Sequence, residues 1–238
     1  MTYTFSKLIQ MPLITRLRSL IRQVPIGRKA LQFVATSISN GYEDRFQKEL
    51  LDSIKLGDTV WDIGANIGFY TEKFLSLVGS EGQVVAIEPT PASAQICREI
   101  GLKASLNNLT VIERAFGSKI GKAYLTIDAE TSVTNHLSSI SSNSLEVLVT
   151  TGDELSVELN HEPNIIKIDV EGFEVEVLAG MSTVLASPNL KAVFVEVHFE
   201  LLEEAGYQNG AQIIVQTLEK NYFYTQWIDF SHIVGFKK

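Results

Sequence analysis

An acidic residue and two glycines stand close together where an apolar segment of the sequence gives way to a predicted helix. Asp62 precedes Gly64 by two positions, and Gly68 lies at the start of the predicted helix. Glycines at such a turn let a backbone approach a ligand closely. In dinucleotide-binding folds the turn holds a pyrophosphate, which the carboxylate of Asp62 would repel. The sequence therefore favours a cofactor that carries positive charge, such as S-adenosylmethionine with its ammonium and sulfonium groups.

Further candidates for cofactor contact stand at the ends of the next predicted strands. Glu88 ends the apolar run 84–87, and a carboxylate there can accept hydrogen bonds from both ribose hydroxyls of an adenosine. That ribose belongs to NAD as well as to S-adenosylmethionine. Glu113 ends the following strand, where it would either approach the adenine or lie in solvent. The predicted cofactor-binding residues are Asp62, Gly64, Ala65, Asn66, Gly68, Tyr70, Thr71, Glu88 and Glu113.

Three carboxylates and a histidine follow two later strands and form the predicted catalytic set. Asp169 ends one strand, and Glu196 and His198 end the next. Neighbouring parallel strands lie about 4.8 Å apart, so these ends should meet across one cleft. Residues 196 and 198 share a face because side chains alternate along a strand. Glu171 either joins this set or interacts with the start of the following helix.

Such a set can serve the deprotonation of an alcohol, which needs a general base or a metal because the pKa of an alcohol lies far above 7. In one hypothesis, His198 or Asp169 takes the hydroxyl proton directly. In the other, Asp169 together with Glu196 or His198 binds Mg²⁺ or a similar ion. We prefer the direct base, since carboxylates and one imidazole do not specify an ion.

The elements that position these residues alternate between strand and helix patterns. Strands are predicted at Thr59–Ile63, Gln83–Glu88, Thr110–Glu113, Asn164–Asp169 and Lys191–His198. Helices are predicted at Phe69–Leu77, Pro91–Leu102, Phe173–Leu185 and Ala211–Lys220, and Tyr222–Trp227 and His232–Phe236 form a closing hairpin. The strands are rich in Val and Ile without polar alternation, which is typical of a parallel sheet covered on both faces. The predicted fold is an α/β, Rossmann-like, doubly wound and mostly parallel seven-stranded sheet with an antiparallel C-terminal strand.

A Ser/Thr-rich run, residues 131–144, interrupts this alternation between two strand-like segments, Ala123–Ile127 and Leu145–Thr150. Long insertions of this kind often cover active sites. We therefore expect either an active-site lid or a disordered loop.

Charge divides the chain into a basic leader and an acidic body. Residues 1–40 contain six basic and no acidic residues, so with a net charge of −8 overall the remainder carries −14. Within the leader, apolar residues between Leu13 and Val24 recur at helical spacing. We predict an N-terminal extension, residues 1–44, and one domain, residues 45–238. The extension would pack on the domain, on a second copy of the chain, or on a membrane surface.

Composition excludes several other classes. The acidic balance argues against nucleic acid as a partner. No apolar run reaches the length of a transmembrane segment, and no secretory signal is recognisable. The only cysteine, Cys97, rules out an internal disulfide and suits a reducing cytoplasm.

Two segments of the sequence resemble those of a known enzyme family. Residues 62–68 with 86–89 look like a class I S-adenosylmethionine-dependent methyltransferase, and residues 166–174 running to 177–180 resemble the signature of the FkbM methyltransferases. The resemblance implies methyl transfer to an oxygen, typically a hydroxyl of a sugar or natural product. It also implies that Asp62, Gly64, Asn66, Gly68 and Glu88 hold the cofactor.

Two alternatives remain open at this stage. An NAD-dependent oxidoreductase would share the glycine turn and Glu88, but Asp62 argues against it. A non-catalytic protein that only binds the cofactor would not need the polar set around Asp169 and His198.

Overall fold

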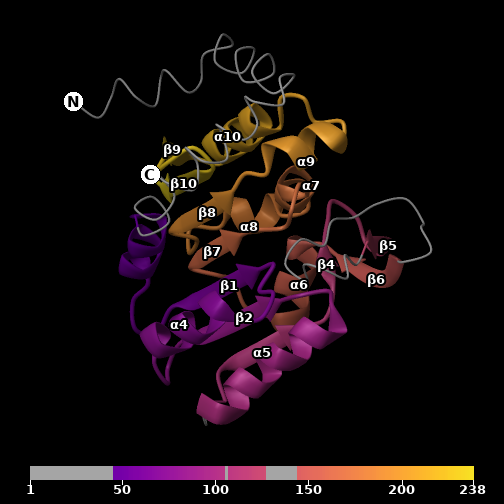
Figure 1. Cartoon of the computed structure of the whole chain (residues 1–238). Coiled ribbons are helices and arrows are strands. Elements are labelled where there is room, and N and C mark those ends of the chain that lie inside the picture. Colours follow the sequence, from indigo (N-terminus) through magenta and orange to yellow (C-terminus); the bar gives the residue numbers. More distant parts are fainter. Residues whose placement is uncertain (1–44, 105–106, 127–143) are drawn as a thin grey trace, which may run out of the picture.

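The computed structural model describes residues 45–104, 107–126 and 144–238 (Figure 1). Residues 45–53 form a helix that leads into the first strand. The strands of the main sheet are β1 (Thr59–Ile63), β2 (Gln83–Ile87), β3 (Leu109–Ile112), β7 (Ile165–Ile168), β8 (Ala192–Glu196), β9 (Phe223–Trp227) and β10 (His232–Lys237). The helices that connect them are α4 (Phe69–Val78), α5 (Pro91–Ala104), α6 (Gly152–Leu159), α7 (Glu174–Ala179), α8 (Ser182–Ala186), α9 (Phe199–Glu204) and α10 (Gly210–Lys220).

The main sheet has seven strands in the order β3-β2-β1-β7-β8-β10-β9. Strands β1, β2, β3, β7 and β8 pair in parallel, which confirms the predicted fold class. The C-terminal strand β10 is antiparallel to β8, as predicted, and it lies between β8 and β9, so that β9 forms the edge. Burial explains this, because residues 232–235 of β10 are all buried whereas β9 is mostly half-exposed, as suits an edge strand.

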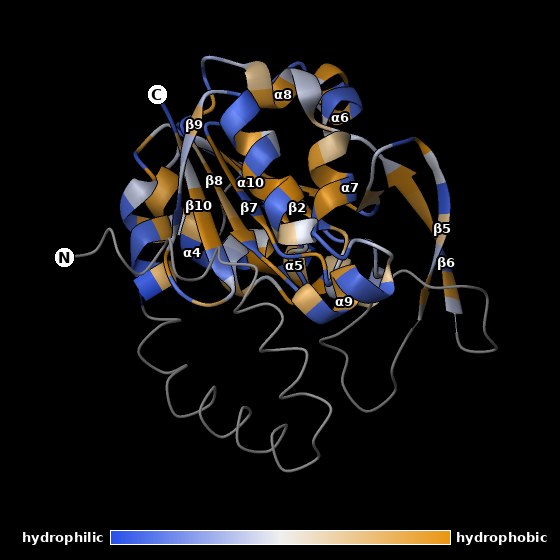
Figure 2. Cartoon of the chain, turned by 90° about the horizontal axis from the view of Figure 1, so that it is seen from above, coloured by the Kyte–Doolittle hydropathy of each residue, from blue (hydrophilic) through white to orange (hydrophobic). Residues whose placement is uncertain are grey.

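Helices cover both faces of the sheet, so that its strands are buried between two layers (Figures 1 and 2). Alternate residues of β1 enter different cores. Trp61 packs with the side chains of α6, α7, α8 and α10, whereas Val60 packs with those of the helix at 45–53 and of α4. Asp62 is on the same face as Val60, because side chains alternate. It therefore points toward α4.

A small second sheet follows β3. It contains β4 (Ala115–Phe116), β5 (Gly121–Thr126) and β6 (Ser144–Thr150) in the order β4-β6-β5, with β5 and β6 antiparallel. The two strand-like segments predicted on either side of the Ser/Thr-rich run are thus strands. The run itself lies outside the described residues apart from Ser144, and so does the lid prediction.

The single helix predicted at Phe173–Leu185 is instead two short helices, α7 and α8, that meet at Gly180. A Cβ at Gly180 would lie 2.1 Å from the backbone oxygen of Gly117, so this close approach requires glycine. The carboxylate of Asp153 accepts hydrogen bonds from the backbone N–H groups of Thr183 and Val184. It thereby caps the start of the second helix.

Among the described residues, none of the helices combines the length and the hydrophobicity that crossing a bilayer requires. The predicted amphipathic helix of the leader lies outside the described part of the chain.

Candidate active site

The glycine turn runs from the end of β1 to the start of α4 and takes conformations that favour glycine. Gly64 has φ of 79° and Gly68 has φ of 81°. A Cβ at Gly64 would lie only 1.8 Å from the backbone oxygen of Asp169, because the turn passes directly against the end of β7. Asn66 also has a positive φ, 49°, which asparagine tolerates better than most residues. The turn is therefore built against the strand that carries a predicted catalytic residue.

Glu88 fixes this turn from the end of β2. Its carboxylate accepts a hydrogen bond from the backbone N–H of Asn66 at 2.9 Å and another from that of Thr90 at 2.8 Å. Burial raises the pKa of Glu88, although these two donors oppose the shift. One carboxylate thus joins the turns that follow β1 and β2, and both of its oxygens retain lone pairs for a further donor.

Asp62 lies beneath the turn, fully removed from solvent. One carboxylate oxygen accepts a hydrogen bond from the hydroxyl of Thr71 at 2.7 Å. The other has no hydrogen-bond partner, but it lies 3.4 Å from the ammonium of Lys167. The charge of Asp62 is therefore balanced in part by this chain's own lysine.

Lys167 connects several parts of the site, since it lies on β7 between the turn and the acidic residues. Its ammonium lies 3.2 Å from the carboxylate of Asp169 and 3.4 Å from the backbone oxygen of Gly64. It also lies 5.0 Å from the centre of the Tyr70 ring, within the range of a cation–π contact. Burial lowers the pKa of Lys167, but Asp169 and Asp62 outweigh burial and raise it, so the lysine stays charged.

His198 lies at the centre of the predicted catalytic set. Its Nε2 atom is 3.3 Å from the Glu171 carboxylate, 3.8 Å from that of Asp169 and 3.9 Å from that of Glu196. The ends of β7 and β8 thus bring all four predicted residues together. Glu171 has a positive φ of 50° and lies three residues before α7, so it faces the cluster and is not in the first turn of that helix.

Glu174 holds the other side of the His198 ring. This carboxylate has no exposed surface and lies 2.7 Å from Nδ1 of His198. It also accepts a hydrogen bond of 3.0 Å from the backbone N–H of Gly172. Burial opposes protonation of His198, but Glu174 and the neighbouring acids outweigh it and raise the pKa of the imidazole to about 9. Burial also raises the pKa of Glu171, to about 6. At neutral pH His198 is therefore an imidazolium.

Glu196 contacts a second histidine on the neighbouring strand. Its other carboxylate oxygen lies 3.5 Å from Nε2 of His232. Burial raises the pKa of Glu196, but His232, His198 and Lys167 outweigh burial and lower it to about 2. These cations therefore favour the ionised form of Glu196.

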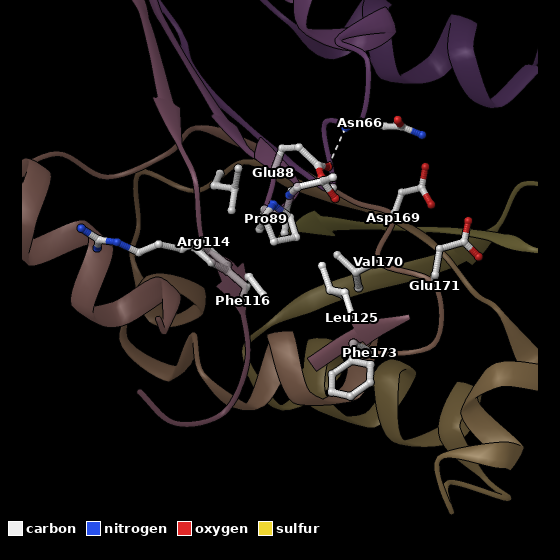
Figure 3. A pocket seen from close by; sticks show the side chains of 15 residues that line it. Asn66, Glu88, Pro89, Arg114, Phe116, Leu125, Asp169, Val170, Glu171 and Phe173 are labelled. Atoms are coloured by element: carbon white, nitrogen blue, oxygen red, sulfur yellow. Dashed lines mark hydrogen bonds between the residues drawn. The ribbon is translucent and has the colours of Figure 1, made fainter. Parts of the chain in front are cut away.

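A cavity of about 120 Å³ opens beside these groups (Figure 3). Gly64, Asn66 and Glu88 line it from the turns, and Asp169 and Glu171 line it from the end of β7. The remaining lining residues are mostly apolar: Ile63, Ile87, Pro89, Thr90, Arg114, Ala115, Phe116, Leu125, Val170 and Phe173. Figure 3 shows the carboxylates of Asp169 and Glu171 at one end of the cavity and the Arg114 guanidinium directed away from it. The cavity therefore has an apolar body and a polar end.

The other residues predicted to bind a cofactor do not line this cavity. Asp62 and Thr71 are buried beneath the turn, and Tyr70 lies against Lys167. Gly68 starts α4, and Ala65 is buried with its N–H bonded to the backbone oxygen of Ile87. Glu113 pairs with Arg98 at 2.7 Å, in the more exposed of the two positions that the sequence allowed.

Sequence reasoning overlooked three residues that shape the site: Lys167, Glu174 and His232. Lys167 was recognisable as a lone charge in an otherwise apolar strand. Glu174 stood within the signature that carries the family resemblance but received no role. His232 begins the second strand of the predicted closing hairpin, and nothing local in the sequence places it beside Glu196.

Comparisons with known proteins agree with this geometry. The family model described as "Methyltransferase FkbM domain" matches residues 62–237. The hexuronic acid methyltransferase AglP of Haloferax volcanii is 32% identical over 152 residues, which cover 63% of this chain and 59% of that protein. The chain thus spans less than two thirds of the length of this relative.

Two solved structures share the fold at low sequence identity. One, from Clostridium thermocellum and assigned as an rRNA methylase, has a TM-score of 0.51 and 12% identity, covering 84% of this chain and 93% of that one. The other, from Streptococcus mutans, is assigned as a methyltransferase and was solved in complex with SAH. It has a TM-score of 0.51 and 10% identity, covering 84% of this chain and 97% of that one.

Proposed function

Because the chain belongs to the FkbM methyltransferase family, we propose that it is an S-adenosylmethionine-dependent O-methyltransferase that acts on a hydroxyl of a saccharide or natural product. One observation carries the proposal. The ends of β7 and β8 bring Asp169, Glu171, Glu196 and His198 together beside the turn that follows β1. Ligands of doubly wound sheets bind at this edge.

The residues at the turn fit S-adenosylmethionine. Gly64 and Asn66 line the cavity, and the apolar surface formed by Ile87, Pro89 and Phe116 suits an adenine ring. The carboxylate oxygens of Glu88 have lone pairs that can accept hydrogen bonds from the ribose hydroxyls. Because Lys167 balances the charge of Asp62, this charge alone does not select the cofactor. The glycine turn and Glu88 therefore carry more of the argument than the sequence suggested.

When bound, S-adenosylmethionine would supply a methyl group on a sulfonium. An acceptor hydroxyl that took this methyl group would have to lose its proton. We assign Asp169 to accept that proton, because its carboxylate lines the cavity and is adjacent to the turn. His198 is the weaker candidate, since its raised pKa leaves it protonated at neutral pH. As an imidazolium it would instead stabilise the anionic form of the neighbouring carboxylates.

A divalent cation is the second mechanistic hypothesis. Asp169, Glu196 and His198 each offer one donor atom, and these atoms all lie within 4.8 Å of one another. Carboxylate oxygens with one imidazole suit Mg²⁺ or Mn²⁺. Turnover measured after treatment with EDTA distinguishes the direct-base mechanism from the metal-dependent one. The direct base predicts unchanged turnover, whereas a loss that added Mg²⁺ restores would establish the metal.

The acceptor class follows from the relative, which is named a hexuronic acid methyltransferase. We propose a sugar hydroxyl, because Asp169 can accept the proton that such a hydroxyl loses. The proposal is tested by incubating the full chain with methyl-labelled S-adenosylmethionine and a panel of neutral saccharides and hexuronic acids, with products identified by mass spectrometry. Labelled product supports the proposal. Failure with every acceptor, together with tighter binding of NAD than of S-adenosylmethionine in calorimetry, would favour the oxidoreductase alternative.

The parts outside the site complete the proposal. We assign residues 45–238 to the catalytic domain and residues 1–44 to an extension, in a cytoplasmic enzyme whose partner is a small molecule or glycan and not nucleic acid. The basic, apolar residues 1–40 would bring the enzyme to an anionic membrane surface or to a second copy of the chain. Deleting them should reduce sedimentation with anionic vesicles, and unchanged sedimentation would exclude the membrane contact.

A further inference from the structure

We propose that His232 is a positioning residue of the active site: it reaches from β10 to hold the Glu196 carboxylate between itself and His198. The inference rests on the proposed function for its effect on turnover. It gives a role to the antiparallel strand that lies between β8 and β9.

The sheet register places the two residues opposite each other. His232 of β10 is the direct cross-strand partner of Glu196 of β8. Nε2 of His232 lies 3.5 Å from one carboxylate oxygen of Glu196, and Nε2 of His198 lies 3.9 Å from the other. Glu196 is therefore flanked by an imidazole on each side, and removing one would free it to turn toward the other.

His232 is itself held firmly. The carboxylate of Asp229 lies 2.8 Å from Nδ1 of the ring and accepts the backbone N–H of His232, also at 2.8 Å. The ring of Phe46, from the helix at 45–53, lies over the imidazole with centroids 4.0 Å apart and an interplanar angle of 30°. Because Asp229 engages Nδ1, Nε2 is the ring nitrogen left to face Glu196.

The same arrangement occurs twice around Glu196. Glu174 holds Nδ1 of His198 as Asp229 holds Nδ1 of His232, and each histidine presents Nε2 to the acidic cluster: His232 to Glu196 at 3.5 Å, and His198 to Glu171 at 3.3 Å and to Glu196 at 3.9 Å. A histidine that only completed the core would need neither a buried acid behind it nor a carboxylate in front. This repeated pattern indicates that His232, like His198, is oriented toward the acidic cluster that contains Glu196.

A double-mutant cycle tests the inference in the full chain with methyl-labelled S-adenosylmethionine. We expect His232→Gln to lower kcat by roughly 10- to 100-fold, the effect of losing one charge-assisted hydrogen bond. The Kd for S-adenosylmethionine, measured by calorimetry, should stay unchanged, because His232 does not touch the turn. In a Glu196→Gln background, His232→Gln should cause no further loss. His161→Gln is the matched control, since this histidine contacts Thr59 at the opposite end of the sheet.

The inference is overturned if His232→Gln has the kcat of the wild type. It is also overturned if the fold-losses in kcat of His232→Gln and Glu196→Gln multiply in the double variant. A second measurement reports the contact between His232 and Glu196 directly. It requires no methyl acceptor, and it does not depend on whether a His232 variant folds. In two-bond ¹H–¹⁵N spectra of the histidine rings, Glu196→Gln should shift the Nε2 resonance of His232 and leave that of His161 in place. An unshifted His232 resonance would refute the contact itself. If the resonance shifts but the wild type methylates no acceptor, the proposed function alone fails.

Discussion

Lys167 allows a quantitative test of how the site is held together. It is only 3% exposed, and it is the charged neighbour of Asp62, which has no exposed surface. Removing one partner of a buried ion pair typically costs about 3–5 kcal/mol, because the remaining charge is left uncompensated. We expect Lys167→Met to lower the free energy of unfolding by about this amount, which is a large fraction of the roughly 5–15 kcal/mol of a typical domain. Urea denaturation followed by circular dichroism measures it.

Two further variants separate charge from packing. Adding Asp62→Asn to Lys167→Met removes the unpaired charge, so the double variant should regain part of the lost stability. Arg98→Met is the control, because Arg98 pairs with Glu113 at 2.7 Å and both side chains are more than a third exposed. It should cost less than about 1 kcal/mol. The reasoning is refuted if Lys167→Met costs no more than Arg98→Met, or if the double variant is less stable than Lys167→Met.

Two other predictions concern the turn and the histidines. Gly64→Ala should weaken S-adenosylmethionine binding in calorimetry by about tenfold or more, because the new Cβ would meet the backbone of Asp169 and a positive φ alone costs about 1–2 kcal/mol. Gly57→Ala, at a positive φ with open space around it, should bind like the wild type, and equal binding by both variants would contradict the close approach. Stability should also depend on pH, since His198 and His232 have pKa values raised from 6.5 to about 9 and the folded state therefore holds their protons more tightly. The free energy of unfolding should be highest near pH 6.5 and fall by about 3 kcal/mol per histidine as the pH rises to about 9. Urea titrations at several pH values measure it, and a free energy of unfolding that stays constant over this range would count against these ion pairs.

Local patterns in the sequence predict much of the frame of the site. The run from Thr59 to Ile63 is apolar enough to be a buried strand, and Gly64 and Gly68 mark the turn that ends it. The meeting of Asp169 with His198 is predictable because both follow strands of one parallel sheet, and parallel strands end at the same edge. These inferences need only hydrophobic runs and their order along the chain.

Partners that come from distant parts of the chain were not predictable in the same way. The lysine in the strand Ile165–Ile168 signals a buried charge, but nothing in the sequence says that it lies between Asp62 and Asp169. The position of β10 beside β8 is set by tertiary burial, and that pairing alone brings His232 to Glu196. The break of the helix at Gly180 likewise arises from the nearby backbone of Gly117 and not from the helix's own sequence.

The central claim is that the chain transfers a methyl group at the Asp169 end of its cavity. The most direct test compares the wild type with Asp169→Asn in two assays: calorimetric binding of S-adenosylmethionine, and transfer of its labelled methyl group to a saccharide acceptor. We predict that the variant binds S-adenosylmethionine within a few fold of the wild type but transfers at least about 100-fold more slowly, as expected when a general base is removed. Transfer at the wild-type rate by Asp169→Asn would contradict the account.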